Sequence, residues 1–387
     1  MIKIVTIVGA RPQFIKAAAI SRAIRDGFSD SIKEIIVHTG QHYDENMSKV
    51  FFEELDIPHE DHNLHVGSDS HANQTARIME GIEKILLLEK PDCILLYGDT
   101  NSTLAGAVVA SKLHVPIIHV EAGVRSYNKH YPEEVNRIVC DHLSTLLFTP
   151  TVSGVNNLIK EGFNPDNKQP YTMNNPKVFF CGDIMYDNSI HFAEVAKEKS
   201  MILSKLGIEG KDYVLVTVHR PHNTDDILAL NSLFRTFDEL SVKDKIQFMI
   251  PIHPRTQKAM ETGLDSGLYH SVKNNPYIQI IPPASFLDII QLEANASMIM
   301  TDSGGIQKEA YFFHKPCIIF QEDTAWIELV ESGNARVVGS DEIKIKEAYN
   351  YFNANRDSLK YPPMYGDGKA AQFICLQIVE AFNGNRV

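Results

Sequence analysis

The chain is poor in cysteine, and it has no long apolar run and no surplus of positive charge. Its five cysteines are scattered and odd in number, and no Cys-x-x-Cys pair occurs, which argues against a disulfide framework and a thiolate metal cluster. No apolar run is long enough to span a bilayer, and residues 1–8 are typical of a strand rather than a signal peptide. We therefore predict a cytoplasmic protein that does not enter the membrane.

The net charge of −12 argues against a nucleic-acid-binding protein, because such proteins present a basic face to phosphates. The sequence also lacks a Gly-x-Gly-x-x-Gly fingerprint, a P-loop and a nucleophile elbow, which disfavours hydride transfer, ATP hydrolysis and acyl transfer. No two histidines have the spacing of metal ligands with acids nearby. We expect no cofactor, no metal and no nucleic-acid partner.

A chain of 387 residues exceeds the usual size of one hydrophobic core, so two domains are expected. Short apolar runs alternate with amphipathic helices such as 74–88, which indicates parallel sheets covered on both faces. The first series of strands is predicted at 4–8, 34–39, 93–97, 117–120 and 146–149. The second is predicted at 178–181, 213–218, 247–251, 278–281, 298–301 and 317–320.

Residues 162–176 are rich in proline and asparagine, which is typical of a surface connection. We predict an α/β protein of two Rossmann-like, doubly wound domains whose strand ends face a common cleft. The first domain covers residues 1–170 and is joined by a C-terminal helix at 366–387, and the second covers residues 177–365.

The turn Asp302-Ser303-Gly304-Gly305 is the most informative motif, because it lies between an apolar strand and a helix. Adjacent glycines allow a ligand to approach the backbone, and the first N–H groups of the helix favour an anion such as phosphate. Glu309, about one helical turn further on, is placed to reach a sugar hydroxyl beside that phosphate. The alternative is a serine N-cap with glycines that only form the turn.

Cationic and carboxylate side chains follow several of the predicted strands, and ligands of doubly wound sheets bind at these carboxyl ends. The candidate cations and donors are Arg11, Lys16, Arg220, Arg255, His219 and His253. Each is alternatively a surface or structural residue. The candidate acids are Asp99, Glu121 and Glu133, which suit proton transfer on a sugar attached to a diphosphate. Asp99 is alternatively a helix N-cap, and Glu133 an acid that complements a helix dipole.

Together these segments resemble the non-hydrolysing UDP-N-acetylglucosamine 2-epimerase family, in order and over essentially the whole chain. The matching segments are 9–12, 40–42, 98–100, 120–123, 132–137, 218–220, 251–254, 301–310 and 365–370. The resemblance implies a GT-B fold and a cytoplasmic homodimer in polysaccharide biosynthesis. It also implies inversion of C2 in a UDP-linked 2-acetamido sugar, through loss of UDP and an alkene across C1 and C2.

The resemblance also assigns roles to individual residues. The implied catalytic residues are Asp99, Glu121, Glu133 and His219. The implied substrate-binding residues are Arg11, Lys16, Arg137, His253, Phe286, Ser303, Gly304, Gly305 and Glu309. Among these, the Ser303 turn with Arg11 and His219 would hold the diphosphate, Glu309 the ribose and the 283–286 stretch the uracil.

Two segments depart from the glucosamine branch of the family. The chain has Gly9-Ala10-Arg11-Pro12-Gln13 where that branch often has Gly-Thr-Arg-Pro-Glu, and Gln41-His42-Tyr43-Asp44 where an allosteric site lies in some members. Both local forms resemble a branch that acts on UDP-2,3-diacetamido-2,3-dideoxy-glucuronate. A carboxylated sugar would favour an extra cation, and Arg125, Lys129 and His130 are candidates, or else plain surface residues.

Two other functions fit the same fold. A GT-B glycosyltransferase would share the diphosphate site, but it would not need the acids Asp99, Glu121 and Glu133 beside the sugar. A catalytically silent nucleotide-sugar-binding protein would bind UDP without turnover, and the complete set of acids argues against it.

Overall fold

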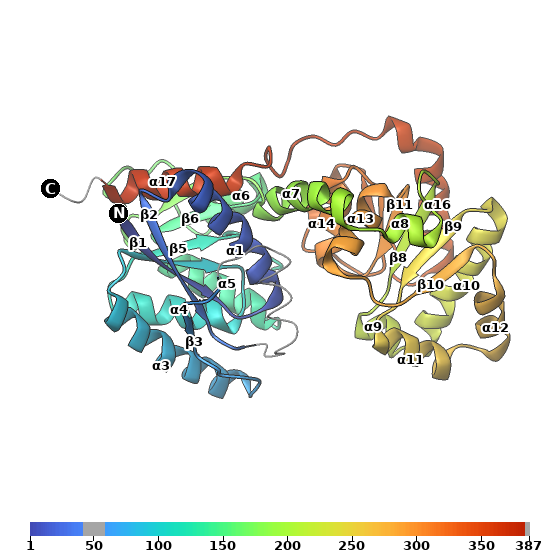
Figure 1. Cartoon of the computed structure of the whole chain (residues 1–387), viewed down its shortest axis with the longest axis horizontal. Helices are drawn as coiled ribbons and strands as arrows, with labels where there is room; N and C mark the ends of the chain where they lie inside the picture. The colour runs from blue at the N-terminus through green and yellow to red at the C-terminus, as the bar shows by residue number, and fades with distance from the viewer. Residues whose placement is uncertain (42–58, 384–387) are drawn as a thin grey trace. The chain divides into compact units, whose positions relative to one another are not determined.

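The computed structural model describes residues 1–41 and 59–383. The chain forms two compact units, the first from Met1–Asn188 with Pro363–Val387 and the second from Ser189–Pro362 (Figure 1). Each unit is a parallel sheet with helices packed against it, so the predicted α/β class with two doubly wound sheets is confirmed. Among the described residues, no helix is both long and apolar enough to cross a bilayer.

The sheet of the first unit has the order β3-β2-β1-β4-β5-β6-β7 with every pairing parallel. Its strands are β1 (Ile2–Val8), β2 (Ile32–His38), β3 (His62–Asn63), β4 (Cys93–Tyr97), β5 (Ile117–Val120), β6 (Leu146–Thr149) and β7 (Lys177–Phe180). The chain reverses its direction across the sheet between β1 and β4, which is where ligands bind in such folds. The helices are α1 (Arg11–Ala23), α3 (His71–Glu89), α4 (Asn101–Lys112), α5 (Pro132–Leu143), α6 (Val152–Lys160) and α17 (Ala370–Asn383), with a π-helical turn at Ile24–Phe28.

Strand β7 differs from the sequence-based grouping, which assigned residues 178–181 to the second series of strands. It pairs with β6 in the first sheet, from Leu146 opposite Lys177 to Thr149 opposite Phe180. The preceding proline-rich segment is a loop within the first unit, held in part by the Asn167 side chain donating to the Pro176 carbonyl. Composition alone does not distinguish such a loop from a connection between domains.

The amphipathic helix predicted at 74–88 is α3, which starts three residues earlier. Ser70 caps its first turn by accepting from the Asn73 N–H, a favourable end for a helix. Ile78 and Ile82 are buried, and Leu86 continues the same face. This spacing of four residues places one apolar stripe against the sheet.

The sheet of the second unit has the order β10-β9-β8-β11-β12-β13, again with parallel pairing throughout. Its strands are β8 (Tyr213–Thr217), β9 (Gln247–Pro251), β10 (Ile278–Ile281), β11 (Met298–Thr301), β12 (Cys317–Ile319) and β13 (Ala335–Val337). The larger helices are α10 (Ile227–Asp244), α11 (Pro254–Gly263), α12 (Ser266–Asn274), α13 (Phe286–Asn295), α14 (Gly304–Phe312) and α16 (Glu342–Asn355). Short helices are α8 (Ile202–Leu206), α9 (Pro221–Thr224) and α15 (Ile327–Glu331), while α7 (Ile184–Lys199) runs across the boundary between the units. The reversal in this unit lies between β8 and β11.

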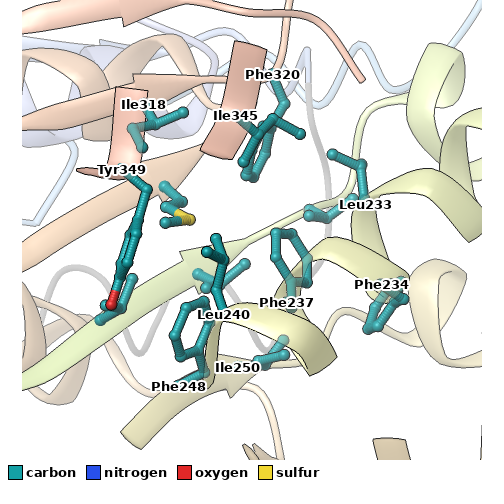
Figure 2. Close-up of a cluster of buried hydrophobic side chains, with 14 of the residues drawn as sticks. Leu233, Phe234, Phe237, Leu240, Phe248, Ile250, Ile318, Phe320, Ile345 and Tyr349 are labelled. Carbon is teal, nitrogen blue, oxygen red and sulfur yellow. The ribbon is translucent and has the colours of Figure 1, made fainter. Parts of the chain in front are cut away.

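An aromatic cluster fills the core of the second unit between α10, α16 and the sheet (Figure 2). The ring centroid of Phe237 lies 5.5 Å from that of Phe234, 5.6 Å from that of Phe320 and 6.2 Å from that of Phe248. These are ordinary distances for tilted and edge-to-face aromatic pairs. The cluster fixes the strands β8 and β9, whose carboxyl ends carry His219 and His253.

The last segment of the chain belongs to the first unit, where α17 packs against α1 and β1 (Figure 1). The Asp187 carboxylate accepts from the N–H groups of Ala370 and Ala371 at the start of α17, at 3.1 and 2.7 Å. Gly182, with φ of 84°, lies so near the returning chain that a β-carbon would be 2.7 Å from the Tyr365 carbonyl oxygen. Only glycine permits that approach.

We predict that Leu233→Ala destabilises the protein far more than Leu228→Ala, although both leucines lie on α10. Leu233 is fully buried in the aromatic cluster, whereas Leu228 is 82% exposed. Loss of the buried side chain should lower the free energy of unfolding by about 2–5 kcal/mol. The exposed change should stay within about 0.5 kcal/mol. Urea unfolding of the two variants checks this, and equal losses would contradict the assigned burial.

Candidate functional site

Lys16, Asp99 and Glu121 come together at the carboxyl ends of the adjacent strands β1, β4 and β5. The Lys16 Nζ lies 2.7 Å from the Glu121 Oε2, and both side chains are largely buried. Gly98, with φ of 61°, lies against this pair, since a β-carbon there would be 3.2 Å from the Lys16 Nζ and 3.7 Å from the Glu121 Oε1. The missing side chain lets the ion pair lie directly against the backbone before Asp99.

The helix α5 supplies Arg137 and Glu133 to the same place. Arg137 forms an ion pair with Asp99, and its other nitrogen lies 3.0 Å from the Glu134 Oε2. The Asn136 amide donates to the Asp99 carbonyl at 2.8 Å. Glu133 is exposed in the first turn of α5. One end of the sheet therefore carries the three predicted acids together with two of the predicted cations.

The pKa values of two of these carboxylates shift in opposite directions. Burial raises the pKa of Asp99, opposed by Arg137 and reinforced by Glu121 and Glu133. For Glu134, burial also works against the charge, but hydrogen bonds from the Ser126 and Tyr127 N–H groups bring its pKa below the usual value. The pKa of Asp99 is therefore raised and that of Glu134 lowered, and the Glu134 carboxylate anchors the loop before α5 through the two N–H groups.

Glu121 has a φ of 75°, in the left-handed region that non-glycine residues seldom occupy. The Phe148 carbonyl on β6 holds it there by accepting from the N–H groups of Glu121 and Ala122, at 3.1 and 3.0 Å. The ion pair with Lys16 then fixes the carboxylate. Strained residues held by their surroundings are concentrated at functional sites.

In the second unit, the turn predicted as an anion site has the expected form. Strand β11 ends at Thr301, and α14 begins at Gly304 with Ser303 in the N-cap position. The Ser303 hydroxyl makes no capping hydrogen bond within the described structure, while the Ser303 N–H donates to the Thr301 Oγ1 at 2.9 Å. Gly305 is exposed. Of the two interpretations of this turn, the geometry favours the one that leaves the hydroxyl available to a ligand.

Asp302 is a fully buried carboxylate that ties this turn to the end of β8. It accepts from the His219 and Arg220 N–H groups, both at 2.9 Å, and from the Asn223 amide at 3.0 Å. The His219 Nδ1 lies 3.0 Å from the other carboxylate oxygen. Burial disfavours its charge, yet these donors hold the pKa of Asp302 below its usual value. The predicted residues His219 and Ser303 are therefore connected through Asp302, to which the sequence analysis gave no role of its own.

The remaining predicted residues of this unit surround the same strand ends. The imidazole centroids of His219 and His253 are 6.3 Å apart, and the His253 Nδ1 accepts from the Arg255 N–H as the N-cap of α11. Glu309 lies half-buried on α14, where it adds to the effect of burial in raising the pKa of Glu293 far above the usual value. Phe286 is buried against Phe192 with centroids 5.1 Å apart, so its ring belongs to the core.

Other candidates lie elsewhere. Arg11 begins α1, but its side chain lies outside what the structure describes, as does residue 42 of the Gln41-His42-Tyr43-Asp44 segment. Arg255 pairs with Asp225 on the surface. Arg125 is neither a surface residue nor an open cation for a sugar, because it is buried in ion pairs with Asp141 and Glu161, each at 2.7 Å.

The described residues contain no group of three or more His, Cys, Asp or Glu side chains placed to hold a metal ion. The five cysteines are unpaired, and four of them are buried. Burial raises the pKa of the Cys375 thiol to about 12, which disfavours a reactive thiolate there.

We predict that Asp302→Asn lowers the free energy of unfolding by about 1.5–3 kcal/mol at neutral pH, because charged acceptors of buried N–H groups are worth about that much. The folded pKa of Asp302 is depressed, so its contribution is fully present above the unfolded value near 4 and is lost as the pH falls through the lower, folded value. Guanidinium unfolding at several pH values checks the direction. The exposed Asp357→Asn serves as the control, and a difference that grows in acid would contradict the depressed pKa.

The comparisons with known proteins agree on one family. The sequence profile of the UDP-N-acetylglucosamine 2-epimerase family matches residues 28–379. A UDP-N-acetylglucosamine 2-epimerase homolog of Methanococcus maripaludis is 45% identical over 370 residues, which cover 95% of this chain and 97% of that protein. The UDP-2,3-diacetamido-2,3-dideoxy-D-glucuronate 2-epimerase of Pseudomonas aeruginosa is 42% identical over 373 residues, covering 96% of this chain and 98% of that protein.

Solved structures agree with the sequence relatives. The crystal structure of Methanocaldococcus jannaschii UDP-GlcNAc 2-epimerase in complex with UDP-GlcNAc and UDP matches with a TM-score of 0.80 and 37% identity, over 98% of this chain and 99% of that chain. The predicted GT-B fold and the predicted family are confirmed by these matches. The chain belongs to the UDP-N-acetylglucosamine 2-epimerase family and is an isomerase of the epimerase type.

Proposed function

We propose that the enzyme inverts C2 of UDP-N-acetylglucosamine and so forms UDP-N-acetylmannosamine. The observation that carries this proposal is the cluster of Asp99 and Glu121 with Lys16 and Arg137 at adjacent strand ends. Carboxylates held beside cations suit proton transfer next to an anionic leaving group. The crystallised relative from Methanocaldococcus jannaschii, which contains UDP-GlcNAc and UDP, supports a UDP-sugar as the ligand.

The reaction follows from the chemistry of the sugar. The C2 hydrogen is not next to a carbonyl group, so its removal alone would be very slow. When a carboxylate takes the proton from C2, the C–H electrons form a double bond between C1 and C2, and the C1–O bond breaks with its electrons going to UDP. Protonation of C2 on the opposite face and return of the UDP oxygen to C1 then give the epimer. Oxidation states balance, so the sequence of steps needs no redox cofactor.

The two units have different tasks in this proposal. The second unit binds the diphosphate through the Ser303-Gly304-Gly305 N–H groups and His219, and Glu309 accepts from the ribose hydroxyls. Charge develops on the diphosphate as the C1–O bond breaks, so fixed N–H dipoles there stabilise the transition state more than the ground state. The first unit supplies Asp99, Glu121 and Glu133 for proton transfer. The residues assigned to further substrate contacts are Arg11, Lys16, Arg137 and His253. The ring of Phe286 is not assigned to the substrate, because it is buried against Phe192.

A second candidate substrate is UDP-2,3-diacetamido-2,3-dideoxy-glucuronate. The 42% identity to the Pseudomonas aeruginosa enzyme of that name supports this alternative. Arg125 is unsuited to bind the sugar carboxylate, since Asp141 and Glu161 already pair with it. Lys129 and His130 are exposed in the loop before α5 and remain candidates.

The assembly and setting of the enzyme form a separate part of the proposal. We place it as a homodimer in the cytoplasm, in the synthesis of polysaccharide precursors. These assignments depend on the family resemblance rather than on the site geometry.

We predict that the protein, incubated with UDP-N-acetylglucosamine alone in deuterated water, introduces deuterium at C2 and yields the manno epimer. Elimination exposes C2 to a proton carrier that exchanges with solvent, whereas a glycosyltransferase would leave C2 protonated. NMR of the recovered nucleotide sugars measures the exchange. The diacetamido-glucuronate substrate, tested in parallel, identifies the preferred sugar by its higher kcat/KM.

Each of the other possible results of that experiment would indicate a different function. An undeuterated C2 with both sugars would contradict the epimerase, and release of free N-acetylmannosamine would indicate a hydrolysing enzyme instead. UDP binding without any turnover would indicate a silent binding protein.

We predict that Asp99→Asn and Glu121→Gln each reduce kcat by about 10²–10⁴-fold, because general acid or base catalysis contributes about that much. UDP affinity should stay near the wild-type value, since neither Asp99 nor Glu121 is assigned to the diphosphate. Steady-state kinetics and calorimetric titration with UDP measure the two effects. The exposed Glu83→Gln on α3 is the matched control, and unchanged turnover in both variants would remove the acids from the reaction.

A further inference from the structure

A buried ionic cluster lies next to the turns that carry Asp99 and Glu121 in the first unit. It consists of His119 on β5, Asp141 on α5 and Arg125, whose side chains are 0%, 0% and 1% exposed. The His119 Nδ1 lies 2.6 Å from the Asp141 Oδ1, and an Arg125 nitrogen lies 2.7 Å from the Asp141 Oδ2. Glu161, at the end of α6, pairs with Arg125 from the other side. None of these residues has a role in the proposed reaction.

The hydrogen bonds of this cluster determine its protonation state. The His119 Nε2 lies 2.8 Å from the Gly98 carbonyl oxygen, which can only accept, so this nitrogen carries a hydrogen. Asp141 accepts from the Gly123 N–H at 3.1 Å and pairs with Arg125, so it is ionised, and the His119 Nδ1 must donate to it. Both ring nitrogens are protonated, and His119 is an imidazolium.

The titratable groups around the ring agree with this state. Burial favours a neutral ring, but Cys140 and Asp141 on α5 raise the pKa of His119 well above its usual value. His119 and Arg125 in turn hold the pKa of Asp141 below its usual value despite burial. Two cations, His119 and Arg125, are balanced by two carboxylates, Asp141 and Glu161, which buried charges require.

The cluster contacts both turns that carry the proposed acids. His119 holds the carbonyl of Gly98, the residue directly before Asp99. Asp141 holds the N–H of Gly123, two residues after Glu121. The helix α5 that supplies Asp141 also carries Glu133 and Arg137. One buried ion pair therefore connects the ends of β4 and β5 and the helix α5.

We propose that His119 and Asp141 are positioning residues that hold Asp99 and Glu121 in the geometry for proton transfer at one sugar carbon. The inference depends on the proposed function, because it assumes that these two acids act on the substrate. Small displacements of reacting groups have large effects, and a shift of about 1 Å can reduce the rate about 10²-fold. A merely structural ion pair would affect stability without a selective loss of kcat.

The test uses His119→Gln, Asp141→Asn and the double variant. In His119→Gln, the side-chain amide N–H group can donate to either the Gly98 carbonyl or the Asp141 carboxylate, but not to both. One of the two contacts is therefore lost. In the double variant, the glutamine can donate to the Gly98 carbonyl while its oxygen accepts from the new asparagine. We expect each single variant to lose about 10²-fold in kcat with KM changed less than threefold. The kcat of the double variant should be at least tenfold higher than that of either single variant. His270→Gln, exposed on α12 of the second unit, is the matched control and should leave kcat unchanged.

A second measurement reports the protonation of the His119 ring directly. Nitrogen-15 NMR of the histidine rings in the wild-type protein should show one imidazolium that persists above the usual histidine pKa, and this signal should be absent from the double variant. A neutral His119 ring at pH 7 would overturn the proposal. Folded single variants that keep kcat within twofold of the wild-type value would overturn it too. A rise in KM with unchanged kcat would overturn it as well.

Failure of the proposed function is distinguishable from failure of this inference. Wild-type protein that exchanges no deuterium at C2 of either UDP-sugar refutes the proposed reaction before any variant is examined. Exchange by the wild type with full activity in the single variants refutes only the positioning role.

Discussion

Neutralisation of buried charge at the carboxyl ends of parallel strands is the constraint on which both units depend. The first unit buries carboxylates close together, and in a low dielectric each needs a cation or several N–H donors. The pairs are Lys16 with Glu121, Arg137 with Asp99 and Glu134, and His119 and Arg125 with Asp141. These cations also offset the repulsion that an anionic substrate would meet in a chain of net charge −12.

The second unit meets the same constraint with backbone donors. The Asp302 carboxylate accepts hydrogen bonds from the His219 and Arg220 N–H groups, which follow β8. These bonds join the ends of β8 and β11 without occupying the first N–H groups of α14. Within the described residues, the Ser303 side chain makes no capping hydrogen bond to this helix, which is compatible with the proposed anion site at its N-terminus. In the proposed reaction, the first unit supplies its carboxylates for proton transfer and the second supplies N–H dipoles for the diphosphate.

Much of the fold and part of the site could be predicted from local sequence. Apolar runs flanked by turn residues identified the strands, and the polar residues Asp99, Glu121 and Ser303 lie just after strand ends, as predicted. Strand β7 was assigned to the wrong series, because the residues of a short apolar run do not show which strand it pairs with. His119 and Asp141 were missed because a histidine in an apolar strand and an acid within a helix have no local signature of pairing.

The sequence by itself determined the family and the residue types available for chemistry, because motifs in order over the whole chain depend only on local residue identity. The tertiary structure decided which charges meet. It placed Arg125 in a buried ion pair rather than at the surface, gave Glu121 its strained backbone, and raised the pKa of Asp99 while lowering that of Glu134. Burial and partner distance set the pKa of a carboxyl group, and both arise only when segments far apart in the chain are packed together.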